Sequence, residues 1–264
     1  MTRIHAIFEG QAAVITGAGE GIGFEIARQL ALLGAKVVLN DIDLDRAKSA
    51  AAAIQAEGGQ VTPAGGDVAE PSVVRGLIQQ TVEAFGKVDI AVANAGVTLW
   101  NKFLDYTPED FNRVIAVNLS GSFFLAQAAA RQMRVQEHGG RILLTSSVTA
   151  HQAIEYLSVY AMTKAALEMM AKQLVVELSP LGITVNTVAP GATLTPRNLA
   201  DDPNYETIWG AVTPTGRVAA PTDIANAALF LLSPSASQIT GQTIVVDGGW
   251  TATSPTPSLD FVNQ

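Results

Sequence analysis

The chain has 264 residues and a mass of 27.6 kDa, which suffices for one large α/β domain with a substantial core. Cysteine is absent, so disulfides, thiolate metal sites and a cysteine nucleophile are excluded. The formal net charge of −8 argues against a nucleic-acid partner, because phosphate binding calls for a basic surface.

Short apolar runs alternate with longer helix-like stretches along the whole chain. The expected strands are 12–15, 36–39, 60–64, 90–93, 141–145, 184–188 and 243–246. The expected helices are 24–33, 44–57, 70–85, 108–133, 158–178 and 223–232. This alternation favours right-handed crossovers and a parallel sheet with helices on both faces. We therefore predict a doubly wound, three-layer αβα fold that forms a single domain over residues 1–264.

Two segments interrupt the alternation. Residues 194–215 are rich in Pro, Asn and Asp, and residues 251–264 form a tail that looks irregular. Long loops of this kind are usually functional lids or disordered segments. We expect 194–215 to be a substrate loop.

The sequence also bears on the location of the protein and on metal binding. Residues 1–10 lack the apolar run of a signal peptide, and we find no run of the roughly 20 apolar residues that span a bilayer. A cytoplasmic protein is therefore expected. The three histidines, His5, His138 and His151, are scattered, so no metal site is predicted.

Four glycines in seven residues, at positions 17, 19, 21 and 23, follow the first expected strand and open the first helix. The pattern is G-x-x-x-G-x-G, at Gly17, Gly21 and Gly23, and not the literal G-x-G-x-x-G. Glycines let the backbone approach a pyrophosphate, and the helix N-terminus offers N–H groups to the anion. A purely structural turn is the alternative, but this context favours a dinucleotide site.

Asp41 ends the second expected strand. A carboxylate there accepts hydrogen bonds from the adenosine ribose hydroxyls and repels the 2′-phosphate of NADP. Glu20 adds a second negative charge on the same side. No arginine or lysine occupies either position, which favours NAD over NADP. A capping role for Asp41 is the alternative, although Asp43 and Asp45 suit that role better.

Tyr160 and Lys164 are four residues apart, so on a helix they share one face. A phenol has a pKa of about 10, and a nearby ammonium group lowers that value. A tyrosine tuned in this way exchanges a proton with an alcohol oxygen. Together with Ser147 and the glycine turn, the pair suggests hydride chemistry.

From about residue 11 to residue 250, these motifs and their order resemble the classical short-chain dehydrogenase/reductase family, which implies a Rossmann-like fold. The resemblance implies a catalytic tetrad of Asn118, Ser147, Tyr160 and Lys164. Tyr160 would be the acid or base, Ser147 would hold the substrate oxygen, and Lys164 would lower the tyrosine pKa. Ser147 is chosen over Ser146 because it lies 13 residues before Tyr160, the spacing common in the family.

The same resemblance implies a coenzyme site. Its residues would be Gly17, Glu20, Gly21, Ile22, Gly23, Asp41, Asp67, Val68, Asn94, Ala95, Gly96, Tyr160, Lys164, Pro190, Gly191, Thr193 and Thr195. Family members are usually homotetramers that assemble through the helices near 108–133 and 158–178 and through the C-terminal strand, and we expect the same here.

Substrate residues are predicted from the variable loops and are His151, Gln152, Glu155, Tyr156, Asn198 and Trp209. Polar groups mixed with aromatic ones suit a sugar, a polyol or a small hydroxy compound. The expected function is NAD-dependent oxidation of a secondary alcohol. Alternatives are a reductase of ketones, hydroxysteroids or 3-oxoacyl thioesters and, more remotely, a non-catalytic NAD-binding regulator. The intact set of Ser147, Tyr160 and Lys164 argues against the last.

Overall fold

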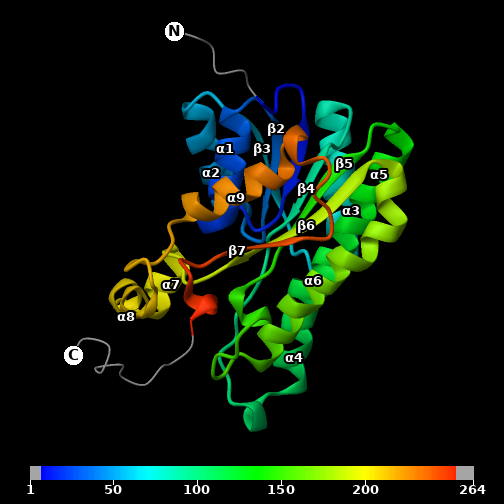
Figure 1. Cartoon of the computed structure of the whole chain (residues 1–264). Coiled ribbons are helices and arrows are strands. Elements are labelled where there is room, and N and C mark those ends of the chain that lie inside the picture. Colours follow the sequence, from blue (N-terminus) through cyan, green and yellow to red (C-terminus); the bar gives the residue numbers. More distant parts are fainter. Residues whose placement is uncertain (1–6, 254–264) are drawn as a thin grey trace, which may run out of the picture.

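A computed structural model describes residues 7–253 and contains one parallel seven-stranded sheet (Figure 1). The strands are β1 Ala12–Ile15, β2 Lys36–Asp41, β3 Gln60–Gly65, β4 Ile90–Ala93, β5 Gly140–Thr145, β6 Ile183–Pro190 and β7 Thr243–Val246. Their order is β3-β2-β1-β4-β5-β6-β7. The order reverses between β1 and β4, and this reversal is where a doubly wound sheet opens a crevice at its carboxyl edge. The predicted single-domain, Rossmann-like fold is confirmed.

Helices cover both faces of the sheet. On one face, one apolar core contains buried residues of α1 Gly21–Leu32, α2 Leu44–Ala56 and α9 Pro221–Leu232. On the other face, a second core contains residues of α3 Pro71–Phe85, α5 Ser122–Gln136 and α6 Ser158–Leu178. Three shorter helices, α4 Pro108–Val114, α7 Pro196–Asp201 and α8 Tyr205–Val212, lie outside these two layers.

The central strands supply both cores from alternate positions. In β1, Ile15 joins the core under α1 while Val14 joins the core under α5. Successive side chains of a strand point to opposite faces, so a strand covered on both sides must be apolar throughout. This explains why the central strands β1 and β4 are continuous, fully buried apolar runs, and the sequence predicted the bounds of both.

Two helical predictions need correction. Residues 108–133 were expected to form one helix, but a π-helical segment, Ile115–Gly121, separates α4 from α5. Residues 194–215 were expected to be a long loop, yet they contain α7 and α8. The Thr195 hydroxyl oxygen accepts the Asn198 N–H at 3.2 Å and Pro196 opens α7, which is a sequence signal for a helix start. Of the predicted tail, only 251–253 fall within the described residues.

Within residues 7–253, one helical stretch, Pro108–Gln136, is long and apolar enough to cross a membrane by length and composition alone. The most apolar part of this stretch has a mean hydropathy of 1.2, and half of it is buried inside the fold. Leu125 and Met133 of α5 belong to the core against the sheet. Packing within the fold therefore accounts for the apolar side chains on the buried side of this stretch.

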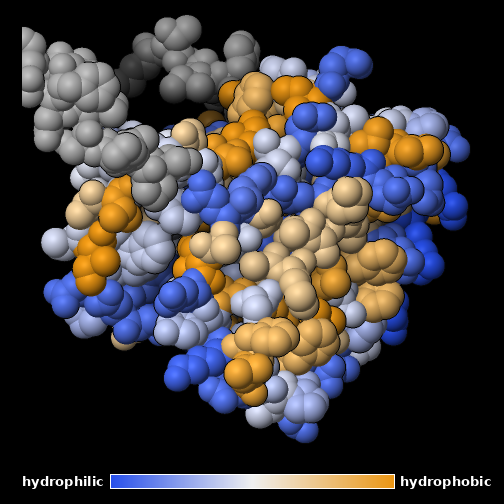
Figure 2. Space-filling model, turned by 60° about the horizontal axis from the view of Figure 1, so that its bottom comes forward, coloured by the Kyte–Doolittle hydropathy of each residue, from blue (hydrophilic) through white to orange (hydrophobic). Residues whose placement is uncertain are grey.

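Apolar side chains also lie on the outer faces of α5 and α6. Phe123, Met169 and Val176 are 42%, 60% and 73% exposed, respectively. In Figure 2, which brings the α4 end of the molecule forward, apolar side chains gather in patches between polar ones. Exposed apolar surface that is contiguous usually marks a contact site.

Hydrogen bonds join the turn after β1 to the end of β4. The Thr16 hydroxyl oxygen accepts the N–H groups of Asn94 and Ala95, each at 3.2 Å. The Asn94 amide nitrogen donates to the carbonyl oxygens of Thr16 at 3.1 Å and Gly17 at 2.8 Å. A Cβ at Gly23 would collide with that Asn94 amide nitrogen and with the Gly17 carbonyl oxygen, so this turn requires glycine at position 23.

We predict that Gly23→Ala lowers the free energy of unfolding by about 1–3 kcal/mol, as overpacking of a tight site does. The control is Gly76→Ala in α3, where an added Cβ meets nothing within 4 Å. Gly76→Ala should stabilise the protein by roughly 0.5–1 kcal/mol through helix propensity. Urea unfolding followed by circular dichroism measures both, and a Gly23→Ala protein as stable as wild type would contradict the packing argument.

Candidate active site

Two adjoining clefts open at the carboxyl edge of the sheet, each with a volume of about 470 Å³, which is a usual size for small-molecule sites. The first runs from the glycine turn and Asp41 to Tyr160. The second lies on the other side of Tyr160, beneath α7 and α8. Tyr160 and Thr195 line both clefts, so they stand at the junction.

The first cleft gathers most of the residues expected at a coenzyme. Its lining includes Gly17, Glu20, Gly21, Ile22, Asp41, Asp67, Val68, Asn94, Ala95, Gly96, Tyr160, Lys164 and Thr195. Pro190, Gly191 and Thr193 line the second cleft. Gly23 lines neither, because it packs beneath the turn against Asn94 and Gly17.

The geometry of the turn fits a dinucleotide. Helix α1 begins within the glycine turn, and its N-cap residue Glu20 makes no side-chain hydrogen bond to the first-turn N–H groups. Gly21 and Ile22, which carry two of those groups, line the cleft. Uncapped N–H groups at a helix N-terminus attract a phosphate through hydrogen bonds and the helix dipole.

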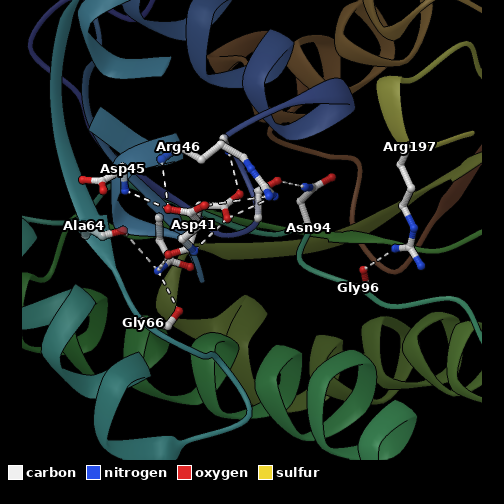
Figure 3. Close-up of polar contacts among 12 residues, drawn as sticks. Asp41, Asp45, Arg46, Ala64, Gly66, Asn94, Gly96 and Arg197 are labelled. Atoms are coloured by element: carbon white, nitrogen blue, oxygen red, sulfur yellow. Dashed lines mark hydrogen bonds and ion pairs between the residues drawn. The ribbon is translucent and has the colours of Figure 1, made fainter. Parts of the chain in front are cut away.

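At the far end of this cleft, Asp41 lies beside an arginine that the sequence argument overlooked (Figure 3). Asp41 is 5% exposed. Its carboxylate accepts the N–H groups of Gly19 and Asp43, each at 3.1 Å. A guanidinium nitrogen of Arg46, in the first turn of α2, is 3.6 Å from Asp41 Oδ1. No arginine or lysine occupies positions 20 and 41, as the sequence shows, but the fold brings the Arg46 guanidinium beside Asp41.

The predicted tetrad draws on three elements, because Tyr160 and Lys164 share α6. Lys164 on α6 is buried, its Nζ donates to the Thr145 carbonyl oxygen at 2.7 Å, and it lies 5.3 Å from the centre of the Tyr160 ring. Ser147 follows β5, and its hydroxyl oxygen accepts the Thr149 N–H at 3.2 Å. Asn118 lies in the π-helical segment.

The fully buried Asn118 side chain is held by the backbone of Val97. Its Oδ1 accepts the Val97 N–H at 2.8 Å, and its Nδ2 donates to the Val97 carbonyl oxygen at 3.0 Å. Rare π-helical turns occur frequently at functional sites. Here the π-helical turn directs the Asn118 side-chain amide toward the loop that follows β4.

The pKa values of the central pair shift in opposite directions. Burial raises the pKa of Tyr160, while hydrogen bonds with Ser147 and Thr98 and the charge of Arg197 only partly offset the rise. Burial also lowers the pKa of Lys164 to about 8. The expectation of a phenol pKa below its ordinary value is therefore wrong in its net direction, because desolvation exceeds the favourable interactions.

Among the predicted substrate residues, Asn198 and Trp209 line the second cleft. His151, Gln152, Glu155 and Tyr156 are not among its lining residues. His151 Nε2 pairs with Glu168 Oε1 at 3.0 Å, and Gln152 Nε2 donates to the Thr251 carbonyl oxygen at 2.9 Å. Glu155 and Tyr156 are exposed. Within residues 7–253, no three His, Asp or Glu side chains group as a metal site.

An aromatic series forms one wall of the second cleft. The Tyr205 and Trp209 ring centres are 6.0 Å apart, and those of Trp209 and Trp250 are 6.1 Å apart. Trp250 comes from the turn Trp250–Ala252 after β7, so this turn meets α8 here. The sequence argument did not select Trp250, since nothing local relates it to a helix some 40 positions earlier.

Arg197 is a second residue that sequence reasoning missed. From α7, its guanidinium donates to the carbonyl oxygens of Gly96 at 3.3 Å and Thr98 at 3.0 Å, and Figure 3 shows it beside Gly96. These bonds tie α7 to the loop after β4. The Arg197 charge also acts on Tyr160.

Comparison with known proteins agrees with this geometry. The family model described as enoyl-(acyl carrier protein) reductase matches residues 17–251. An L-rhamnose 1-dehydrogenase (NAD(P)(+)) of Sphingomonas sp. strain SKA58 is 40% identical over 247 residues, which cover 92% of this chain and 97% of that protein.

Solved structures are equally similar. A short-chain type dehydrogenase/reductase from Mycobacterium marinum has a TM-score of 0.90 at 37% identity and covers 94% of this chain and 98% of its own. A 7α-hydroxysteroid dehydrogenase, complexed with NADH and 7-oxo glycochenodeoxycholic acid, has a TM-score of 0.88 at 38% identity with the same coverage. The chain belongs to the short-chain dehydrogenase/reductase family, a family of oxidoreductases that use nicotinamide coenzymes.

The depressed pKa of Lys164 predicts a pH-dependent stability. Below pH 8 the buried ammonium is charged and destabilises the folded state; between pH 8 and about 10.5 the folded protein has released this proton while the unfolded chain retains it. The free energy of unfolding of the wild type should therefore increase relative to that of Lys164→Met as the pH rises. From pH 7 to 9.5 the difference between them should change by about 2 kcal/mol.

Urea unfolding of both proteins at pH 7 and pH 9.5 measures this change. The matched control is Lys172→Met, an exposed lysine further along the same helix, whose difference from wild type should stay constant. If the Lys164→Met difference were also constant, the buried ammonium would not carry the cost assigned to it.

Proposed function

We propose that this protein is an NAD-dependent oxidoreductase that transfers hydride between NAD and a secondary alcohol of a sugar, polyol or small hydroxy compound. The observation that carries the proposal is the junction of the two clefts. Tyr160 lines both, Lys164 lies below its ring, and Ser147 shares a hydrogen bond with its phenol. A proton donor is thus shared between a dinucleotide-shaped cleft and a second cleft of substrate size.

The proposed mechanism assigns proton transfer to Tyr160. Because burial raises its pKa, the phenol is protonated near neutral pH and can donate to a carbonyl oxygen in the direction of reduction. In oxidation the phenol first releases its proton, and the resulting phenolate then receives the alcohol proton. Ser147 holds the same oxygen by a hydrogen bond and stabilises the charge that develops on it. The coenzyme supplies or accepts the hydride.

Lys164 and Asn118 are proposed to connect this proton to solvent. A Cβ at Gly96 would lie 3.5 Å from both Asn118 Oδ1 and Lys164 Nζ, so both polar groups border one small space. We propose that a water there links the lysine to solvent. The low pKa of Lys164 suits it to pass a proton onward instead of holding a permanent charge.

The proposed substrate class rests on the second cleft. Trp209 and Trp250 offer flat apolar surface for a ring, while Asn198, Asp201 and Asp202 offer polar groups for hydroxyls. The similarity to an L-rhamnose dehydrogenase supports a sugar. The alternative is a reductase of ketones, hydroxysteroids or 3-oxoacyl thioesters, which the similarity to a hydroxysteroid dehydrogenase favours. Ile154 and Leu157 give the cleft apolar surface for it.

A substrate screen separates these classes. Aldoses, polyols, hydroxysteroids and 3-oxoacyl thioesters would be assayed with NAD(H) and NADP(H) by absorbance of the reduced coenzyme. We expect turnover of aldoses or polyols with NAD, because Asp41 is suited to accept hydrogen bonds from ribose hydroxyls. Turnover confined to steroids or thioesters would favour the reductase alternative.

Tyr160→Phe should lower kcat by at least about a hundredfold, because it removes the acid–base group, while the affinity for NADH stays within about twofold. Steady-state assays and fluorescence titration with NADH measure the two quantities. Tyr156→Phe is the matched control, since that tyrosine is exposed and lies outside the cleft linings. Retained turnover in Tyr160→Phe would refute its assigned role.

We also propose a cytoplasmic homotetramer. The exposed apolar side chains of α5 and α6, which include Phe123 and Met169, suit an interface between copies of the chain. Replacing Met169 by Glu would put a charge into that interface and should reduce the mass found by light scattering to that of a smaller assembly. The exposed substitution Glu109→Gln is the control, and an unchanged tetramer mass in Met169→Glu would place the interface elsewhere.

A further inference from the structure

A carboxylate that lines neither cleft lies beside the residues of the proposed reaction. Glu168 is on α6, four positions after Lys164 and eight after Tyr160, so the three side chains leave the helix along one side. The Glu168 side chain is 13% exposed, and it is not among the lining residues of either cleft. Its contacts are with the chain that carries Ser147.

One oxygen of this carboxylate contacts the turn at both of its ends. Glu168 Oε1 accepts the Ser146 hydroxyl at 2.7 Å and lies 3.0 Å from His151 Nε2. A carboxylate oxygen has lone pairs for both donors. Ser146 directly precedes Ser147, which is the N-cap of the short helix Val148–Ala150, and His151 is the C-cap. The two contacts therefore bracket the segment that presents the Ser147 hydroxyl.

The Ser146 contact is the buried one of the two. Ser146 is 1% exposed, and its hydroxyl also donates to the Lys164 carbonyl oxygen at the longer distance of 3.1 Å. Its N–H donates to the Val188 carbonyl oxygen of β6 at 2.8 Å. Weakening the hydrogen bonding of a buried hydroxyl is costly, so the bond to Glu168 fastens the start of the turn to α6.

The bonds within the turn set the orientation of Ser147 only relative to the turn itself. The Ser147 hydroxyl oxygen accepts the Thr149 N–H at 3.2 Å, and its carbonyl oxygen accepts the Ala150 N–H at 3.0 Å. Neither bond reaches the helix that carries Tyr160. The contacts of Glu168 do, because this residue shares α6 with Tyr160.

We propose that Glu168 is a positioning residue that holds Ser147 at the distance from Tyr160 at which both can bond to one substrate oxygen. The inference rests on the proposed oxidoreductase function. It also gives His151 a role other than the substrate contact expected from the sequence, since His151 anchors the far end of the turn to α6. Precision matters here, because a misplacement of about 1 Å caused by a distant mutation can slow a reaction about a hundredfold.

Glu168→Leu removes both contacts and should lower kcat by at least about tenfold for a substrate found in the screen. KM should stay within about threefold, because the charge on the substrate oxygen develops mainly in the transition state. Glu168→Gln keeps an acceptor oxygen at the same place and should retain at least about half of kcat. If Gln were as damaging as Leu, the carboxylate charge would act in some other way and the positioning role would be refuted.

A double-mutant cycle separates positioning of Ser147 from a general loss of structure. Once Ser147→Ala has removed the hydroxyl, adding Glu168→Leu should change the residual kcat, measured at high enzyme concentration, by less than about twofold. An equal loss in both backgrounds would overturn the inference. The matched control is Glu83→Leu in α3, an exposed glutamate that accepts the Gln79 side-chain amide at 2.7 Å, and it should leave kcat unchanged.

Amide hydrogen exchange tests the contact without any substrate. The N–H groups of residues 150–152 donate to the carbonyl oxygens of Ser147 and Val148, so loosening the turn should speed their exchange. Glu168→Leu should show this increase, whereas Glu168→Gln and Glu83→Leu should not. Unchanged exchange in Glu168→Leu would contradict the inference. Expected exchange in a wild-type protein that turns over no alcohol or ketone would instead refute the proposed function and leave the hold of Glu168 on the turn in place.

Discussion

The hydrogen bonds between Thr16 and Asn94 are the constraint on which the rest of the site depends. They join the glycine turn after β1 to the end of β4, across the point where the strand order reverses. A doubly wound sheet would diverge at that point, since its flanking helices leave in opposite directions. By closing the two strand ends together, these bonds hold the α1 N-terminus beside the loop that carries Gly96.

Burial gives the central pair its character. Lys164 is buried and Tyr160 is half-buried between the clefts, and desolvation disfavours the charged form of each. Their pKa values therefore move apart, from ordinary values that are nearly equal to about 8 for Lys164 and a raised value for Tyr160. Desolvation in the pocket has the largest effect on the phenol, and the charge that acts on it is the Arg197 guanidinium.

The two clefts differ in how far sequence reasoning reaches. Most predicted coenzyme residues line the first cleft, because a tight turn and a strand end place their residues through local backbone geometry. Of six predicted substrate residues, only Asn198 and Trp209 line the second. That cleft is assembled from α7, α8 and the turn at Trp250, and the contacts between these segments depend on how distant parts of the chain pack.

The sequence by itself determined the layered fold and the strand positions, which follow from the alternation of apolar runs and helical stretches. It also indicated the motif residues, through their resemblance to a known family. Only the tertiary structure decided three further matters: the position of Arg46 over Asp41, the bonds from Arg197 to the loop after β4, and the upward shift of the Tyr160 pKa. The physical reason is the same for all three. Charge interactions and desolvation depend on distances through space, and a linear sequence does not record those distances.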